Sequence, residues 1–232
     1  MLIKNFKGWL NESSAPAQLD AVKAKLERLG IWGGDLSSQS RCKGCKDEPQ
    51  TREFFVTHHS ATSGDALEVL NILNARGMGV NWIVDKKGKA WLARPFDKRG
   101  DHILDSDNSR VQDFNVTVNG KVLTNSNTEG VEVVGMSDAE VAANPAQIEA
   151  TCQLIFALGY TPDKVANHGK INPGRKMPDE GLAIKNAYQT KYYEYLKAGD
   201  PNLLYGKEYP HRHSDNLYLP KKPDPNLPIK KN

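Results

Sequence analysis

Apolar runs of strand length alternate along this chain with segments of helical periodicity, and this order constrains the fold more than any other feature. The strand-like runs are residues 53–57, 81–85, 89–94, 129–134 and 164–167. The segments with apolar residues at helical spacing are 17–30, 65–76, 145–158 and 181–197. Such an order predicts a mixed α/β protein built around one central sheet.

The composition excludes several classes of protein. In 232 residues, 38% are hydrophobic, which is enough for a substantial core, and no apolar run approaches the roughly 18 residues of a membrane span. The net charge of +3 gives no strong case for nucleic-acid binding. Three cysteines are too few for a disulfide scaffold. Met1–Glu12 lacks the unbroken apolar stretch of a secretory signal, so we expect synthesis in the cytoplasm without a signal peptide.

Changes in composition predict three regions. Residues 1–50 are expected to form a helical appendage and a polar linker, residues 51–198 the main domain, and residues 199–232 an extended tail that is rich in proline and basic residues. Cys42 and Cys45 form one CxxC pair. A structural zinc site needs a second pair of ligands at similar spacing, so two ordinary thiols in a linker are favoured.

Metal-ligating residue types occur at or near the ends of three strand-like runs. His58 and His59 end the first run, His168 follows the last, and Glu132 lies within a buried apolar run. Neighbouring residues of a strand point to opposite faces, so we expect only one histidine of the first pair to be a ligand. Two histidines and a carboxylate form a common catalytic zinc set. From the residues alone, a zinc hydrolase and a scatter of unrelated histidines both stay open.

Three blocks of sequence resemble the type 2 N-acetylmuramoyl-L-alanine amidases, the family of AmpD-like enzymes, phage amidase endolysins and peptidoglycan recognition proteins. The blocks are His58–Thr62, Thr128–Gly135, and His168 together with Pro173–Lys176. They occur in the family's order and at its spacing, and the resemblance covers about residues 53–195. It implies the peptidoglycan-recognition-protein-like fold, with a single central sheet, mostly antiparallel or mixed, between helices.

The resemblance implies a Zn²⁺ cofactor bound by His58 and His168. The family's third ligand stands two residues after its conserved lysine, where this chain has Pro178. We therefore expect the ligand to be displaced to Asp179, with Glu180 as the alternative.

The other site residues also follow from the resemblance. Glu132 is expected to act as general base and Lys176 to face the developing oxyanion. Asn125, His102 and Arg175 are expected to bind glycan or stem-peptide groups. The implied substrate is bacterial peptidoglycan, which is cut at the amide between the lactyl group of N-acetylmuramic acid and L-alanine.

Two further points stay open at this stage. A module of the same fold could bind peptidoglycan without cutting it, and the presence of Glu132 and of a third ligand favours the enzyme. Met1–Glu12 resembles the removable capsid-targeting peptides of large tailed phages, although an ordinary surface helix is equally compatible. These features predict a phage amidase, an endolysin or a virion component, that acts on the cell wall as a monomer.

Overall fold

The computed structural model describes residues 15–45, 47–103, 117–172 and 176–199. Within these residues the α-helices are α2 (Ala15–Arg28), α3 (Ala66–Arg76), α4 (Asp138–Ala142), α5 (Pro145–Ala157), α6 (His168–Ile171) and α7 (Leu182–Ala198). The strands are β1 (Trp32–Asp35), β2 (Phe54–His59), β3 (Trp82–Val84), β4 (Ala90–Leu92), β5 (Thr117–Val118), β6 (Lys121–Val122), β7 (Thr128–Val133) and β8 (Val165–Asn167). Two 3-10 turns, η1 (Ser37–Gln39) and η2 (Pro162–Lys164), complete the description.

Six strands form one central sheet in the order β1-β4-β3-β7-β2-β8. Only the β3–β4 pair is antiparallel, and the other four pairings are parallel. The prediction of a mixed sheet flanked by helices is confirmed, but parallel pairing predominates where the expectation also allowed a mostly antiparallel sheet. The reason is connectivity, because α3 leads from β2 to β3, and α4 and α5 lead from β7 to β8, so that these strands can run in the same direction. A short turn joins β3 to β4, and these two strands are antiparallel. The strands β5 and β6 form a separate hairpin.

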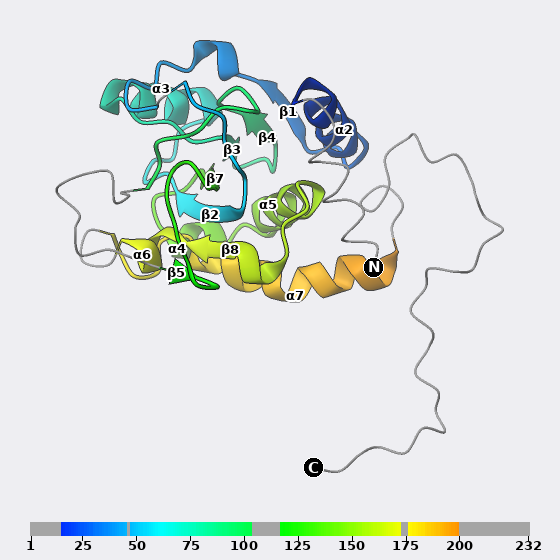
Figure 1. Ribbon diagram of the computed structural model, residues 1–232. Coiled ribbons are helices and arrows are strands. Elements are labelled where there is room, and N and C mark those ends of the chain that lie inside the picture. Colours follow the sequence, from blue (N-terminus) through cyan, green and yellow to red (C-terminus); the bar gives the residue numbers. More distant parts are fainter. Residues whose placement is uncertain (1–14, 46, 104–116, 173–175, 200–232) are drawn as a thin grey trace, which may run out of the picture.

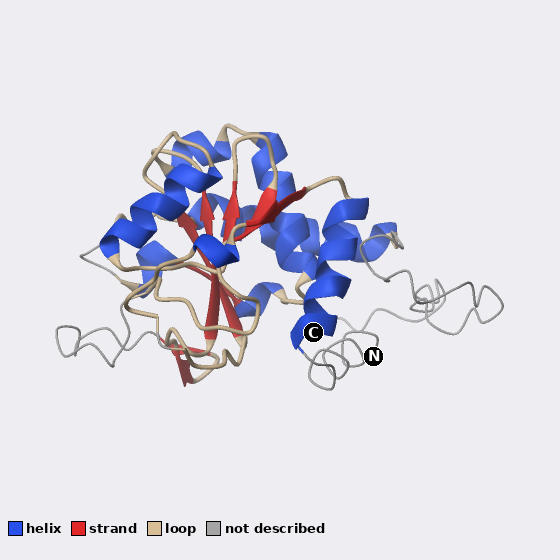
Figure 2. Cartoon of the chain, turned by 90° about the horizontal axis from the view of Figure 1, so that it is seen from above, coloured by secondary structure: helices blue, strands red, loops and turns tan. Residues whose placement is uncertain are grey.

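Helices cover both faces of this sheet (Figures 1 and 2). One face packs against α2, α5 and α7 in a single core that includes Phe55, Trp82 and Val131. The other face packs against α3 near its centre, through Ile83 and Val134. Alternate residues along each strand therefore contribute to opposite cores, as the two-residue repeat of a strand requires.

The second face carries α3, whose ends are set by local sequence. The Asp65 side chain accepts a hydrogen bond from the Glu68 amide and caps the first turn. Gly77, in the left-handed conformation at φ 72°, ends the helix. The helix lies over the end of the sheet where the predicted ligand residues occur.

The predicted appendage is part of the main body. Val22 and Leu26 of α2 are 1% and 0% exposed and belong to the core that holds Phe55 and Trp82. β1 pairs with β4 as an edge strand of the central sheet. Within the described residues, the segment before residue 50 thus shares a core and a sheet with the residues that follow. The polar residues after β1 suggested a linker and gave no sign of this burial.

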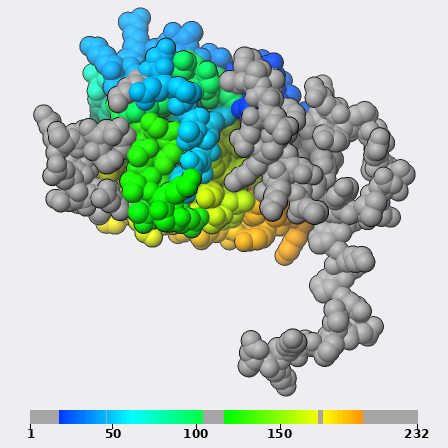
Figure 3. Space-filling model, in the orientation of Figure 1, coloured from blue at the N-terminus to red at the C-terminus, as the bar shows by residue number. Residues whose placement is uncertain are grey.

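Residues 50–54 run alongside residues 126–128. The amides of Thr51 and Phe54 donate to the carbonyl oxygens of Ser126 and Asn127. In the space-filling view of Figure 3 this stretch, in cyan, lies beside the green segment that begins at residue 117. These hydrogen bonds hold the start of β2 beside the residues that lead into β7.

Some predictions fall on residues that the structure does not describe. They are the targeting peptide Met1–Glu12, the substrate contact Arg175 and nearly all of the tail at 199–232. Among the described residues, no helix is long and apolar enough to span a membrane.

Candidate active site

Three neighbouring strands bring the predicted residues together at their carboxyl ends. In the parallel register of β2 and β7, His58 lies directly opposite Glu132. On the other side of β2, Asn167 of β8 lies opposite Thr57, so His168, the next residue, lies beside His58. The His58 and His168 ring centroids are 4.2 Å apart. Glu132 and His168, which follow His58 by 74 and 110 positions in the chain, thus lie with it at the same end of the sheet.

Glu180 completes this group from the turn that precedes α7. Its backbone carbonyl accepts hydrogen bonds from the Gly169 amide, at 3.1 Å, and from Asn167 Nδ2, at 3.3 Å. The next residue, Gly181, has φ 79° and lies so close to β2 that a Cβ there would be 2.0 Å from the Thr57 carbonyl oxygen. Only glycine fits this approach. The close packing of Gly181 on β2 turns the Glu180 side chain toward the histidines.

The His58, His168 and Glu180 side chains form a compact set of possible metal ligands. Glu180 Oε1 lies 2.7 Å from His168 Nδ1 and 3.7 Å from His58 Nδ1. Within the described part of the chain, this is the one group of three or more such residues close enough to hold a metal ion. The histidines are buried, as is Glu180.

The third member of this set differs from the expectation. Asp179 is exposed and lies outside the group, while Glu180, the alternative, is 6% exposed and lies within it. The turn Met177–Glu180, closed by the Glu180 amide on the Met177 carbonyl, places these two neighbouring side chains in different surroundings. The resemblance to the family could not determine this, because Pro178 occupies the position of the family's usual ligand.

Glu132 lines the pocket beside this set. Its Oε2 atom is buried and has no hydrogen-bond partner. Burial and the nearby Glu180 carboxylate raise the pKa of Glu132 to about 8, although Lys176 and Arg76 act in the opposite direction. A carboxyl group with a raised pKa and an uncommitted oxygen is typical of a catalytic acid or base.

The pocket has polar and apolar sides. It encloses about 520 Å³ of space, its open mouth included. Its lining residues are His59, Ser60, Ala61, Thr62, Val69, Ile72, Leu73, Arg76, Met78, His102, Glu132, His168, Lys176 and Glu180. The Lys176 ammonium lies 3.2 Å from Glu180 Oε1, so a cation stands next to the candidate metal ligands.

The charges within the ligand set favour metal binding. Burial would raise the pKa of Glu180, but its hydrogen bonds to His168 and His58 outweigh burial and hold that pKa far below the usual range. Burial, and then the neighbouring His168, hold the pKa of His58 well below the usual range. An ionised carboxylate beside a neutral imidazole is the protonation state that a metal requires.

The residues predicted to bind substrate occupy different places. His102 lines the pocket, and its Nδ1 lies 3.0 Å from His58 Nε2. Asn125 is 1% exposed and does not line the pocket. Its side-chain oxygen accepts hydrogen bonds from the amides of His102 and Ile103, at 2.9 and 3.1 Å. The structure thus shows Asn125 supporting the His102 loop, where the sequence suggested a ligand contact.

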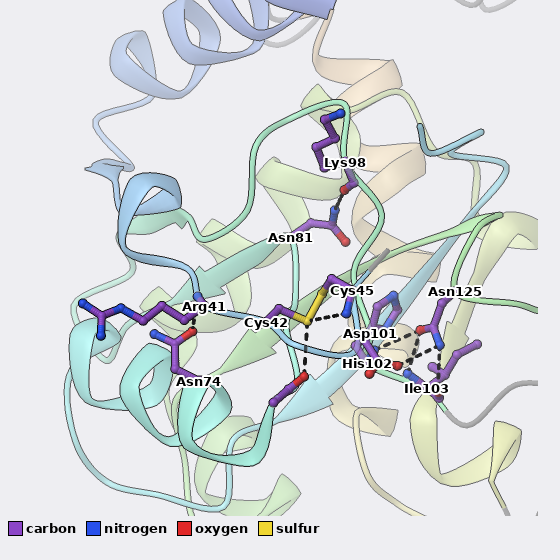
Figure 4. Close-up of a disulfide and its surroundings, with 11 residues drawn as sticks. Arg41, Cys42, Cys45, Asn74, Asn81, Lys98, Asp101, His102, Ile103 and Asn125 are labelled. Atoms are coloured by element: carbon purple, nitrogen blue, oxygen red, sulfur yellow. Dashed lines mark hydrogen bonds between the residues drawn. A yellow bond between two sulfur atoms is a disulfide. The ribbon is translucent and has the colours of Figure 1, made fainter. Parts of the chain in front are cut away.

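A disulfide joins Cys42 and Cys45 beside the same loop (Figure 4). It packs against Gly79, where an added Cβ would lie 2.9 Å from Cys42 Cβ. Gly79 in turn exchanges two backbone hydrogen bonds with Asp101. The prediction of two ordinary thiols is therefore wrong, because the folded segment places their Cα atoms 5.3 Å apart, within the range that a disulfide spans.

Asn172 is a site residue that the sequence did not single out. It is fully buried, and its Oδ1 lies 2.8 Å from His168 Nε2. It stands four residues after His168, one turn of helix along α6. That spacing is a usable signal, since residues at i and i+4 lie on the same side of a helix.

The residues present fit a zinc ion. Two imidazole nitrogens and one carboxylate oxygen converge, and each imidazole has a hydrogen-bond partner on its other nitrogen. Catalytic zinc sites use such sets and leave a fourth position for water or substrate.

Comparison with known families agrees with this geometry. The family model described as N-acetylmuramoyl-L-alanine amidase matches residues 48–179, more than half of the 232-residue chain. The chain belongs to this amidase family. The match includes His58, Glu132 and His168 and ends one residue before Glu180. Comparison with curated proteins gives no match.

Several solved structures resemble this member of the amidase family. A mutant endolysin from Bacillus subtilis is 16% identical, with a TM-score of 0.46, over 68% of this chain and 99% of that chain. The E90A mutant of PlyL is 13% identical, with a TM-score of 0.48, over 68% and 98%. A complex of the peptidoglycan recognition proteins LCa and LCx, bound to tracheal cytotoxin, includes a chain that is 19% identical, with a TM-score of 0.44, over 65% and 94%.

Proposed function

We propose that this chain is a zinc-dependent N-acetylmuramoyl-L-alanine amidase that hydrolyses the amide between the lactyl group of N-acetylmuramic acid and L-alanine. The observation that carries the proposal is the convergence of His58, His168 and Glu180 beside the unpartnered Glu132 carboxylate. Membership of the amidase family supports it. Glu180 takes the ligand role that the sequence suggested for Asp179.

The proposed roles follow from position. His58, His168 and Glu180 would hold the zinc ion, which supplies Lewis-acid activation of water and of the scissile carbonyl. Glu132, with its free Oε2 toward the pocket, accepts the proton of the attacking water and delivers it to the leaving amine. Lys176 stands at the same pocket and stabilises the negative charge that develops on the carbonyl oxygen.

A non-catalytic peptidoglycan-binding module of the same fold is the second candidate. Such a module needs no general base. Glu132 argues against this candidate, because an unpartnered buried carboxylate destabilises the fold and only catalysis gives a reason to keep it.

Product analysis separates the two candidates. Zinc-loaded protein is incubated with purified peptidoglycan, next to a sample that contains a chelator, and the soluble products are examined by mass spectrometry. Stem peptides with a free N-terminal L-alanine, absent from the chelated sample, are expected of the amidase. Unchanged peptidoglycan with protein bound to it would establish the binding module instead.

A phage origin is also part of the proposal, and it rests on the resemblance of Met1–Glu12 to capsid-targeting peptides. The mass of the protein recovered from virions tests it. Loss of the first twelve residues is expected, and an intact N-terminus would contradict the processing.

A further inference from the structure

Both candidate histidine ligands turn the same ring nitrogen toward Glu180. His58 Nδ1 and His168 Nδ1 lie 3.7 and 2.7 Å from Glu180 Oε1. Their Nε2 atoms point to polar partners, His102 Nδ1 at 3.0 Å and Asn172 Oδ1 at 2.8 Å. A neutral imidazole carries one proton, so its hydrogen bond at one nitrogen decides whether the other offers a lone pair to a metal.

The tautomer of His102 is fixed by Thr128. His102 Nε2 lies 3.3 Å from the Thr128 carbonyl oxygen, which can only accept a hydrogen bond. It also lies 3.3 Å from Thr128 Oγ1, whose own hydrogen is donated to the Thr124 carbonyl oxygen at 2.7 Å. Both neighbours therefore accept, so Nε2 of a neutral His102 carries the proton and Nδ1 carries the lone pair.

This arrangement determines the tautomer of His58. Since His102 Nδ1 accepts, His58 Nε2 must donate, and the lone pair of His58 remains on Nδ1, the atom that faces Glu180. We propose that Thr128, His102 and His58 form a hydrogen-bond relay that keeps His58 Nδ1 ready for the metal. His102 is then a positioning residue rather than a substrate contact, an inference that rests on the proposed zinc site.

The structure around His102 holds its ring in this place. Asn125 Oδ1 accepts hydrogen bonds from two successive amides of the loop, as the dashed lines of Figure 4 show. On the sheet side, a Cβ at position 130 would lie 2.6 Å from His102 Nδ1, so Gly130 leaves the space that the ring occupies. The ring therefore packs directly on β7, between Thr128 and Glu132, with its Nδ1 toward β2.

Three variants test the relay through zinc affinity, measured by competition with a chromophoric chelator. His102→Phe keeps a ring but removes both nitrogens, and we expect zinc affinity to fall about 10- to 100-fold. His102→Asn places an amide oxygen near the position of Nδ1 and is expected to recover most of that loss. Thr151→Val removes a buried hydrogen bond, to Gln147, in α5 on the opposite face of the sheet, and is expected to leave zinc affinity unchanged.

Nitrogen NMR of the wild-type protein tests the same relay without a variant that could misfold. We expect a proton on His102 Nε2 in both metal-free and zinc-loaded protein, and a proton on His58 Nε2 with zinc bound. A proton on His58 Nδ1 in the zinc-loaded protein, or equal zinc affinity of wild type and a folded His102→Phe, would overturn the relay. If the wild type takes up no zinc, the proposed function itself fails, and the relay with it.

Discussion

Strand β7 carries two acidic residues, three positions apart, that differ in their hydrogen-bond partners and in the face of the sheet on which they lie. Glu129 is buried and fully partnered: Arg52 Nη2 and Trp82 Nε1 each lie 2.6 Å from its Oε1, and the Tyr160 hydroxyl donates to its Oε2 at 2.8 Å. Glu132, on the opposite face, has a buried oxygen with no partner. One strand thus carries a fully partnered carboxylate in one core and an unpartnered carboxylate at the pocket.

The difference arises from what each face of the sheet packs against. Glu129 points into the core of α2, α5 and α7, where burial of a charge is tolerated only with compensating partners. Glu132 lies at the pocket near Glu180. Burial and the negative charge of Glu180 both raise the pKa of Glu132. We expect the first carboxylate to govern stability and the second to govern activity.

Glu132→Gln tests this contrast with the largest expected effect. The amide cannot accept a proton from water, so we expect the rate of peptidoglycan cleavage to fall about 10²- to 10⁴-fold. Zinc affinity should stay close to wild type, since Glu132 is not among the proposed ligands. A variant that keeps most of the wild-type rate would remove Glu132 from the mechanism.

The same substitution should stabilise the metal-free protein. The folded-state pKa of Glu132 is raised to about 8, so between its unfolded value near 4.5 and pH 8 the unfolded state is ionised while the folded state holds the proton. Stability is therefore lost as pH rises through this window. Glutamine removes that loss, so the gain from Glu132→Gln should be small at pH 4 and grow toward pH 8 in chemical denaturation. A gain independent of pH would contradict the raised pKa.

Glu129→Gln is the matched change on the other face. It breaks a buried ion pair and leaves Arg52 without its carboxylate, so we expect the free energy of unfolding to fall by about 3 kcal/mol. Cleavage per folded molecule should change little. If urea denaturation shows no loss of stability, or if activity falls as far as in Glu132→Gln, the division between the two carboxylates is incorrect.

A second pair of neighbouring acids extends the contrast to the metal. Glu180→Ala removes a proposed ligand, and we expect zinc affinity to fall at least about 10-fold, whereas Asp179→Ala should leave it unchanged because Asp179 is exposed. Chelator competition measures both. The reverse result would restore Asp179 as the third ligand.

The Cys42–Cys45 disulfide should have the smallest effect. It closes a four-residue segment, so its removal in a Cys42→Ser/Cys45→Ser variant is expected to lower the free energy of unfolding by about 2 kcal/mol. Because Asn125 and Gly79 also hold the His102 loop, zinc affinity should be nearly unchanged. Thermal melts and chelator competition on the same variant provide the two readings.

The sequence by itself predicted the local elements, and it singled out His58, His168 and Glu132, which the structure brings close together. The periodicity predicted α3, α5, α7 and the strands β2, β3, β4, β7 and β8 to within a few residues, because hydrophobic spacing reports which face of an element is buried. These three residues stood out because each ends, follows or lies within an apolar run, and the resemblance to the amidase family then implied their roles. These are features of short stretches of chain, which composition and order encode directly.

Only the tertiary structure decided which of two neighbouring acidic residues lies beside the histidines. Glu180 rather than Asp179 faces the histidines because Gly181 packs against β2, a contact between residues more than a hundred positions apart. The burial of α2, the pairing of β1, and the approach of His102 to His58 likewise depend on distant segments that meet. A sequence motif indicates the residue types of a site. The direction of each side chain depends on packing between distant segments, which a local sequence pattern does not specify.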